Sequence, residues 1–345
     1  GMVSSLDPYS SFLEPADFED MMETTEGQFG GLGIQVTTRD GWLTVVTPIE
    51  GTPGSRAGIL AGDRIVEVDG QSTRDLKLSE SVQLLKGDPG TDVTLKIFRA
   101  ETGEEMEVVV ERAIIEVPSV KDVKLLDDGI AYVRVTQFDE LTAPRLQEAL
   151  EKLEEQGMTG LILDLRNNPG GLLRSAVDVC SLFLPAKELV VFTQGRRPSQ
   201  RSEYLTKQGG AFTGARVVIL VNRGSASAAE IVAGCLKDSE RAILIGNRTF
   251  GKGSVQNVIR LPDGSALRLT TAMYYTPSKT VIHEHGIEPH IAVSLTAEEM
   301  QALRGRQRLI NGVDGLDLAH DSQLARAVEV LKSHGIFSAN DRPGN

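Results

Sequence analysis

Two serines, Ser225 and Ser227, lie in the segment VNRGSASAAEIVAG (221–234), where an apolar strand pattern changes to a helical pattern. A serine hydroxyl is a poor nucleophile unless an adjacent base takes its proton. All five histidines lie at position 283 or beyond, so none is near in sequence. The segment RTFGKGSVQNV (248–258) offers Lys252 instead. A lysine between two glycines is by itself more typical of a solvated loop, so the role of Lys252 decides the chemistry.

A catalytic Lys252 requires a displaced pKa. The reference pKa of lysine is about 10.4, so only about one molecule in 2,500 carries a neutral amine at pH 7. A general base works best with a pKa of roughly 7–8, and burial moves a lysine in that direction. We therefore expect an apolar, shielded site if this lysine is the base. Nearby carboxylates would act in the opposite direction in a chain of net charge −12.

The tetrahedral intermediate of such a reaction needs preorganised hydrogen-bond donors. The N–H of Ala228, at the start of the predicted helix, is one candidate and benefits from the helix dipole. The second is expected from LDLRNNPGGLL (163–173), where Gly170 or Gly171 allows a close backbone approach, although a plain turn explains the same glycines. Three further residues are candidates for supporting the site: Glu230, Asp164 and Arg166.

Strand and helix patterns alternate after Pro118, and the strands are almost continuously apolar. This order indicates βαβ units and a largely parallel sheet. Strands are expected at 129–138, 159–168, 215–224 and 241–247, and helices at 142–157, 172–184 and from 226 onward. Leu146, Leu150 and Leu153 mark the inward face of the first helix. Two more helical patterns lie around 297–310 and 322–335.

Residues 27–113 show short strands separated by turns, and one helical segment at 78–87 with Ser79 as a candidate cap. Glycines before and within the first strand make a backbone nest suited to a carboxylate, although a tight turn explains them equally well. The segment GTPGSRAGILAGDRIVEVDG (51–70) makes this module closely similar to PDZ domains. In that family a peptide C-terminus adds as a strand beside a Gly-Leu-Gly-Ile loop.

The PDZ resemblance implies a carboxylate-binding loop and an apolar pocket. The loop residues are Gly31, Leu32, Gly33 and Ile34, and the pocket residues are Leu32, Ile34, Val82 and Leu85. On the residues alone, the four apolar side chains are equally typical of a core.

The motifs LDLRNNPGGLL, VNRGSASAAEI and FGKGSVQ, in this order, resemble the C-terminal processing peptidases, which are tail-specific serine proteases. The resemblance runs from SSLDPYSSFL (4–13) to YYTPSKTVIHEHGIEPHI (274–291). It implies Ser227 as nucleophile, Lys252 as base and Gln256 as the residue that orients the lysine, with Ser225 a turn residue. It also implies the oxyanion donors named above and neither a metal nor a cofactor. Ala-Ala-Glu after the nucleophile replaces the Ala-Ser-Glu of many relatives, a conservative departure.

The predicted fold class is α/β and multi-domain, with a crotonase-like and Clp-protease-like core carrying an inserted, mainly-β PDZ domain. The expected parts are an N-terminal helical segment packing on the core (1–26), the PDZ domain (27–113), the serine protease core (114–296) and a helical tail (297–345).

The resemblance implies a serine endopeptidase that recognises protein C-termini through its PDZ domain and cleaves with a Ser–Lys dyad. Its substrates are expected to be proteins or peptides with accessible, apolar C-termini. The alternative is a catalytically silent, peptide-binding scaffold, which a broken Ser–Lys pair would favour. Terminal helices are candidates for a homodimer or higher oligomer. Relatives act in the periplasm, cell envelope or medium, although no signal peptide is visible in this chain.

Composition excludes several other classes. A net charge of −12 and the lack of a basic stripe argue against nucleic acid as a partner. Cys180 and Cys235 form no disulfide framework and are expected to be buried thiols. His283, His285 and His290 are close in sequence, but the resemblance makes their segment a variable loop rather than a metal site. No apolar run reaches the roughly 18 residues that span a bilayer.

Overall fold

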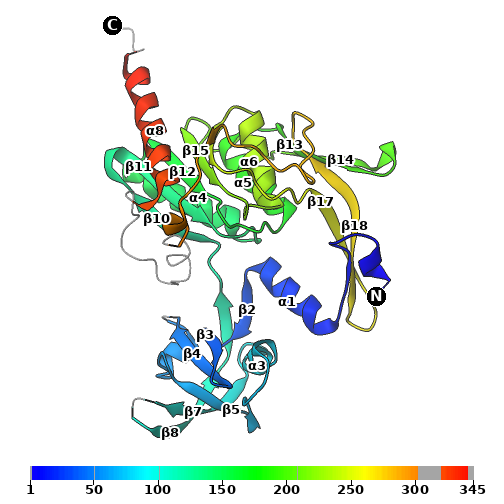
Figure 1. Cartoon of the computed structure of the whole chain (residues 1–345), viewed down its shortest axis with the longest axis vertical. Helices are drawn as coiled ribbons and strands as arrows, with labels where there is room; N and C mark the ends of the chain where they lie inside the picture. Colours follow the sequence, from blue (N-terminus) through cyan, green and yellow to red (C-terminus); the bar gives the residue numbers. More distant parts are fainter. Residues whose placement is uncertain (1, 50, 101, 208, 302–319, 341–345) are drawn as a thin grey trace. The chain divides into compact units, whose positions relative to one another are not determined.

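The computed structural model describes residues 2–49, 51–100, 102–207, 209–301 and 320–340 (Figure 1). The chain divides into two compact units. The smaller unit is residues 27–117, and the larger unit joins residues 1–26 to residues 118–345. The mixed α/β architecture confirms the predicted fold class.

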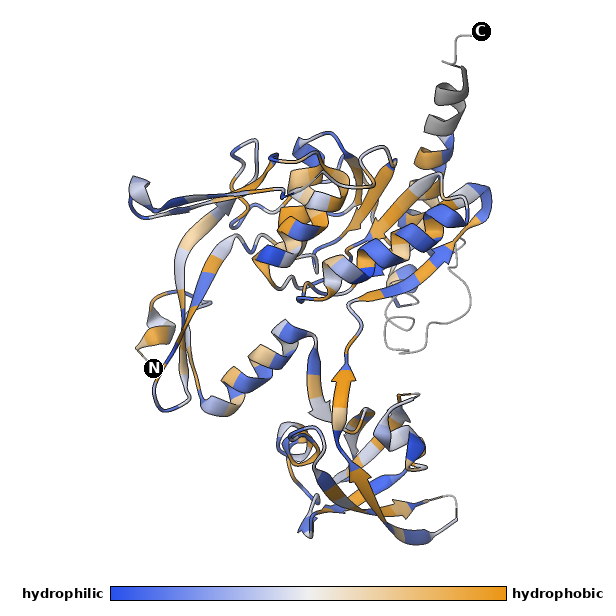
Figure 2. Cartoon of the chain, turned by 180° about the vertical axis from the view of Figure 1, so that it is seen from behind, coloured by the Kyte–Doolittle hydropathy of each residue, from blue (hydrophilic) through white to orange (hydrophobic). Residues whose placement is uncertain are grey.

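A six-stranded sheet lies at the centre of the larger unit. Its strand order is β10-β11-β12-β15-β16-β19, and every neighbouring pair is parallel except β10 and β11. The strands are β10 (Val120–Leu125), β11 (Ile130–Val135), β12 (Gly160–Asp164), β15 (Val217–Val221), β16 (Ala242–Gly246) and β19 (Ile291–Ala292). β12 and β15 are buried at every residue, and Figure 2 shows the central strands as mostly hydrophobic. Strands covered on both faces require such sequences.

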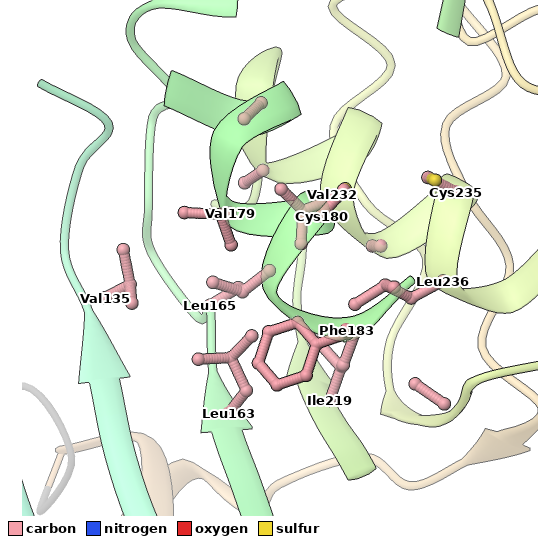
Figure 3. Close-up of a cluster of buried hydrophobic side chains, with 14 of the residues drawn as sticks. Val135, Leu163, Leu165, Val179, Cys180, Phe183, Ile219, Val232, Cys235 and Leu236 are labelled. Atoms are coloured by element: carbon pink, nitrogen blue, oxygen red, sulfur yellow. The ribbon is translucent and has the colours of Figure 1, made fainter. Parts of the chain in front are cut away.

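Three helices cover one face of this sheet, namely α4 (Thr142–Glu155), α5 (Leu173–Phe183) and α6 (Ala228–Asp238). They pack on alternate strand residues and form the main hydrophobic core, part of which is shown in Figure 3. Leu146, Leu150 and Leu153 are buried in it, as their spacing predicts. Cys180 and Cys235 lie in the same core as free thiols, which confirms that prediction.

The opposite face is covered by α8 (Ser322–Asn340), which corresponds to the helix predicted around 322–335. Its apolar residues include Leu324, Ala327 and Leu331, and they pack on the strand residues that point away from the main core. Both faces of the sheet are therefore buried within the larger unit.

A buried ion network joins α8 to the sheet. The Arg166 guanidinium is 1% exposed and donates to Asp164 Oδ2 (2.6 Å), Asp321 Oδ1 (2.9 Å) and Gln323 Oε1 (3.1 Å). The Tyr132 hydroxyl donates to the same Asp164 oxygen (2.7 Å). Each buried charge thus has partners, as a buried charge requires.

A second, five-stranded sheet in the larger unit was not predicted. Its strand order is β1-β18-β13-β14, and β17 also pairs with β18. β17 and β18 together form a long hairpin (Figure 1). The strands of this sheet are β1 (Ser11–Leu13), β13 (Leu189–Gly195), β14 (Arg201–Leu205), β17 (Ser254–Arg260) and β18 (Ala266–Tyr275). The N-terminal segment also contains η1 (Val3–Ser5) and α1 (Pro15–Glu26). Two further short helices of the larger unit are η2 (Asp127–Gly129) and η3 (Pro198–Gln200). The Asp263-Gly264 turn was the signal for this hairpin.

The smaller unit is built on a six-stranded antiparallel sheet of order β3-β4-β5-β7-β8, with β6 on β5, so β3 is an edge strand. β2 and β9 form a separate pair. The elements are β2 (Gln28–Gly31), β3 (Ile34–Arg39), β4 (Trp42–Pro48), α2 (Pro53–Arg56), β5 (Arg64–Val68), β6 (Gln71–Ser72), α3 (Leu78–Leu85), β7 (Asp92–Arg99), β8 (Glu104–Glu111) and β9 (Ala113–Glu116).

Two helices begin at other residues than predicted. α3 begins at Leu78 with Lys77 as its N-cap, so Ser79 as the cap was wrong; the Lys77 N–H donates to the Glu80 carboxylate instead (3.0 Å). α6 begins at Ala228 rather than at residue 226, because Ser227 has a positive φ. Most of the predicted helix at 297–310 lies outside the described residues. No helix in the described ranges is both long and apolar enough to cross a membrane.

Replacing Arg166 by alanine would leave Asp164 and Asp321 buried without a counter-ion. We expect the free energy of unfolding of the larger unit to fall by about 3–5 kcal/mol. Urea denaturation followed by circular dichroism measures this change. Lys152→Ala, which breaks the exposed pair with Glu148, is the control and should cost less than about 1 kcal/mol. Equal losses in the two variants would contradict the network's role.

Candidate active site

Ser227 lies between β15 and α6, as the N-cap of α6, with φ 54° and ψ −114°. A positive φ is uncommon for a residue with a side chain, and such strain of about 1–3 kcal/mol often accompanies a functional position. The residue is half-buried. Ser225, by contrast, is fully buried, and its Oγ donates to Leu165 O (2.8 Å) and accepts from Asn222 N (3.0 Å). The hydroxyl of Ser225 is thus committed to the turn.

The buried carboxylate of Glu230 connects the segment of Ser227 with that of Lys252. Oε2 accepts from the N–H groups of Ser227 (2.9 Å) and Lys252 (2.9 Å), and Oε1 accepts from Gly251 N (2.7 Å) and Thr249 Oγ1. Two backbone nitrogens that share one acceptor oxygen are near neighbours. The structure therefore brings the predicted nucleophile and base into one site, although 25 positions separate them in the sequence.

Lys252 is half-buried, and its pKa is lowered from the ordinary value of a lysine. Burial is the largest cause and the positive charge of Arg268 is the second, while the negative charge of Glu230 acts in the opposite direction. Nζ lies 5.4 Å from the ring centroid of Tyr9, which shields one side of the amine. These surroundings have the character that a lysine base requires.

The side chains of the predicted catalytic set are not hydrogen-bonded to one another. Over the described ranges, no hydrogen bond joins Ser227 Oγ to Lys252 Nζ, or Gln256 to Lys252. Gln256 Nε2 donates to Ser254 Oγ (2.7 Å), and Gln256 lies at the start of β17, directly after the lysine loop. Catalytic hydrogen bonds of this kind commonly tighten only when substrate is bound.

The glycine pair after β12 lies against the nucleophile. Gly170 has φ 102°, and a Cβ placed on it would lie 2.7 Å from Ser227 Cβ and 2.9 Å from Ala228 N. The Gly170 N–H donates to Asn168 Oδ1 (2.8 Å), whereas Gly171 N–H and Ala228 N–H have no acceptor in the described part of the chain. Gly171 and Ala228 are therefore the stronger candidates for the oxyanion donors.

Asp164 and Arg166 do pair with each other, as expected, but they face α8 on the opposite side of the sheet from α6. Their support of the site is therefore not a direct contact. Of the three clustered histidines, His290 Nδ1 accepts from Leu244 N (3.0 Å), and His285 Nδ1 lies 2.7 Å from the carbonyl of His283. No group of three metal-ligating side chains occurs among the described residues.

In the smaller unit, the predicted carboxylate-binding loop connects β2 to β3. Gly33 has φ 69°, its carbonyl accepts from Ile49 N (2.8 Å), and the carbonyl of Leu32 accepts from Gly54 N (2.7 Å). Within the described residues, no acceptor contacts the N–H of Leu32 or Gly33. The loop carbonyls are thus satisfied inside the unit, which leaves its N–H groups free for an anion.

The four predicted pocket residues differ in burial. Leu32 and Leu85 belong to the hydrophobic core of the smaller unit, whereas Ile34 and Val82 are half-buried. A ligand beside β3 would therefore meet mainly Ile34 and Val82.

Comparisons with known proteins agree with this arrangement. Residues 129–293 match the model of Peptidase family S41, and residues 44–99 match that of the PDZ domain. A carboxy-terminal-processing protease of Bartonella bacilliformis is 44% identical over 297 residues, which cover 85% of this chain and 68% of that protein. The chain belongs to this protease family. Its membership confirms the resemblance inferred from the sequence motifs.

Other members of the carboxy-terminal-processing family are also similar. Carboxyl-terminal-processing peptidase 3 of Arabidopsis thaliana, a chloroplastic protein, is 37% identical and covers 98% of this chain and 68% of its own length. Among solved structures, a photosystem II D1 C-terminal processing protease is 33% identical with a TM-score of 0.51, covering 85% of this chain and 80% of that chain.

Three site residues of this family member were missed by sequence reasoning. Asn168 sets the glycine loop through Gly170 and also donates to Val135 O (2.8 Å), and its place directly before Pro-Gly-Gly was a usable signal. Tyr9, in the turn before β1, and Arg268, on β18, both approach Lys252, and neither β1 nor β18 was predicted as a strand. No local pattern in the sequence marks either of them.

Gly170→Ala tests the close approach of the glycine loop to the nucleophile. The new methyl group would meet Ser227 and the Ala228 N–H at a positive φ, so we expect kcat/KM on a protein substrate to fall at least about a hundredfold. Gly214→Ala is the matched control, because nothing lies within 4 Å of its added Cβ, and it should keep wild-type activity. An active Gly170→Ala enzyme would contradict the proposed geometry.

Proposed function

We propose that this protein is a serine endopeptidase that binds protein C-termini through its PDZ domain and cleaves peptide bonds with a Ser227–Lys252 dyad. The observation that carries the proposal is the shared carboxylate of Glu230, which holds the backbone of both residues in one site. Membership of a protease family supports the reaction class.

In the proposed reaction Ser227 Oγ attacks the scissile carbonyl carbon while Lys252 Nζ takes the hydroxyl proton. The N–H groups of Gly171 and Ala228 bind the developing oxyanion, and the dipole of α6 adds to their effect. The carbon–nitrogen bond then breaks, and Lys252 gives its proton to the leaving amine. Water hydrolyses the acyl-enzyme by the same route, with Lys252 again as the base.

The surroundings of Lys252 support its role as the base. Burial lowers its pKa, so the neutral amine is populated at a lower pH than in a solvated lysine. Gln256 is proposed to orient the amine, because its place at the start of β17 puts it next to the lysine loop. Glu230 acts through the backbone rather than on the reacting atoms.

The edge strand β3 supports peptide recognition by the smaller unit. An extended peptide adds to such an edge through main-chain hydrogen bonds, and its carboxylate lies on the free N–H groups of Leu32 and Gly33. Ile34 and Val82 then favour an apolar C-terminal side chain. On this reading the substrates are proteins with accessible, apolar C-termini. From the resemblance to bacterial relatives we further propose a location in the periplasm or cell envelope. We also propose that copies of the protein associate through their terminal helices into a homodimer or higher oligomer.

The dyad predicts how activity responds to substitution and pH. Ser227→Ala and Lys252→Ala should each lower casein cleavage about a thousandfold or more. In the wild type, the rate should fall as the pH drops through the lowered pKa of Lys252, because the protonated amine cannot accept the serine proton. A fluorogenic casein assay from pH 6 to pH 10 measures both effects.

Ser225→Ala is the control for the choice of nucleophile, and it should retain most of the activity because its hydroxyl only braces the turn. If Lys252→Ala cleaved casein as fast as wild type, the dyad would be wrong. A wild-type protein that binds peptides but does not cleave casein would favour the alternative of a catalytically silent scaffold.

Peptide recognition by the PDZ domain is tested in the full-length Ser227→Ala protein, which cannot consume the ligand. A peptide ending in an apolar residue should bind at least tenfold more tightly than its C-terminally amidated form, a difference of about 1.4 kcal/mol or more. Val82→Asp should weaken binding to a similar extent, whereas Val109→Asp, on the exposed face of β8, should not. Fluorescence anisotropy measures the affinities, and equal binding of the acid and amide forms would refute carboxylate recognition.

A further inference from the structure

Arg268 on β18 is a half-buried arginine that forms no ion pair with any described residue. Its Nε is buried and has no hydrogen-bond acceptor, and the same is true of the Oγ of Ser11, its cross-strand partner on β1. Buried polar groups nearly always have partners, so such exceptions require an explanation. A carboxylate close to Arg268 would have been the ordinary solution.

The register of the second sheet places Arg268 on the face that carries Gln256. Arg268 pairs with Val258, and Thr270, two residues on, pairs with Gln256. Cross-strand partners and alternate residues share a face, so Arg268, Thr270 and Gln256 point to the same side of the hairpin. Gln256 follows Lys252 by four residues, so this part of the hairpin begins close to the lysine loop.

The N-terminal segment completes the enclosure of Lys252. Ser10 Oγ accepts from Thr270 N (3.0 Å), and Asp7 accepts from Thr270 Oγ1 (2.9 Å), which anchors the segment on β18. Tyr9, between them, lies with its ring 5.4 Å from Lys252 Nζ and contacts the His283 ring edge-on at 6.4 Å. The N-terminal segment is thus bound to β18 two residues after Arg268 and also approaches the lysine.

Few charges act on the amine of Lys252. Glu230 of α6 is the nearby anion, and Arg268 of β18 is the nearby cation. Asp7 already accepts four hydrogen bonds from its own turn and from Thr270, and His283 presents a buried Nδ1 without a partner among the described residues. Among charged groups, Glu230 and Arg268 act most strongly on the amine, and the Tyr9 ring also favours the ammonium.

We propose that Arg268 is a positioning residue for catalysis, whose unpaired charge offsets that of Glu230 and keeps the Lys252 amine in its neutral, proton-accepting form. This inference rests on the proposed function of Lys252 as the base. Two cations in a partly desolvated site repel each other, which disfavours the lysine ammonium. A carboxylate partner for Arg268 would cancel the effect, and Arg268 has no such partner among the described residues.

The test is the pH dependence of kcat/KM of the full-length enzyme on an internally quenched peptide, from pH 6 to pH 10. Arg268→Gln removes the charge and should move the acidic limb of the profile toward higher pH. The variant should be roughly three- to tenfold slower than wild type near pH 7 and approach wild type at the alkaline end. Arg268→Lys keeps the charge and should restore the wild-type profile. Arg260→Gln, an exposed arginine on β17 of the same hairpin, should leave it unchanged.

A uniform loss at every pH in Arg268→Gln, an unchanged profile, or a failure of Arg268→Lys to restore the limb would each overturn the inference. A rise in KM with an unmoved limb would also overturn it, because that result indicates substrate binding. Thermal denaturation of each variant shows whether it is folded. If Arg268→Gln is unfolded, the pH profile of Arg268→Lys is compared with that of the wild type instead. Lys252→Ala is measured in parallel: an active Lys252→Ala enzyme refutes the proposed function itself, whereas an inactive one with an unmoved Arg268→Gln profile refutes only the role of Arg268.

Discussion

The active site depends on one carboxylate that touches no reacting atom. Glu230 is fully buried, and burial raises its pKa, while four hydrogen bonds from two loops compensate for its desolvation. Because Glu230 binds backbone N–H groups, the side chains of Ser227 and Lys252 stay uncommitted. The backbone at both candidate residues is thus held in place, while the Ser227 hydroxyl and the Lys252 amine have no hydrogen-bond partner among the described residues.

The parallel sheet explains why distant parts of the chain meet. The loops after β12, β15 and β16 carry the glycine pair, Ser227 and Lys252, in that order. These strands are adjacent and parallel, so their carboxyl ends lie at one edge, where ligands bind in open α/β sheets. The sharp conformation of Ser227 and the left-handed glycines let the loops approach within contact distance.

Periodicity predicted the parts of the fold in which one element buries one face. The α4 leucines, the apolar strands and the buried thiols followed directly from the spacing of apolar residues. The second sheet was missed because β18 has mostly half-buried residues and lacks a clear alternation. Sequence motifs predicted Ser227 and Lys252. They could not predict the groups that surround Lys252, because Tyr9 and Arg268 come close to it only through long-range strand pairing. The sequence also could not show which side of the sheet Asp164 faces, because tertiary packing decides it.

The ion network around Arg166 has a consequence for how the protein can be divided. Asp321 and Gln323 lie more than 150 positions after the arginine that they bind, and α8 packs on one face of the central strands of the sheet. A fragment that ended at residue 296 would expose the apolar residues of that face to water and would remove two of the groups that bind the Arg166 guanidinium. The last described helix is thus part of the hydrophobic packing of the larger unit, and we expect a fragment without it to be less stable.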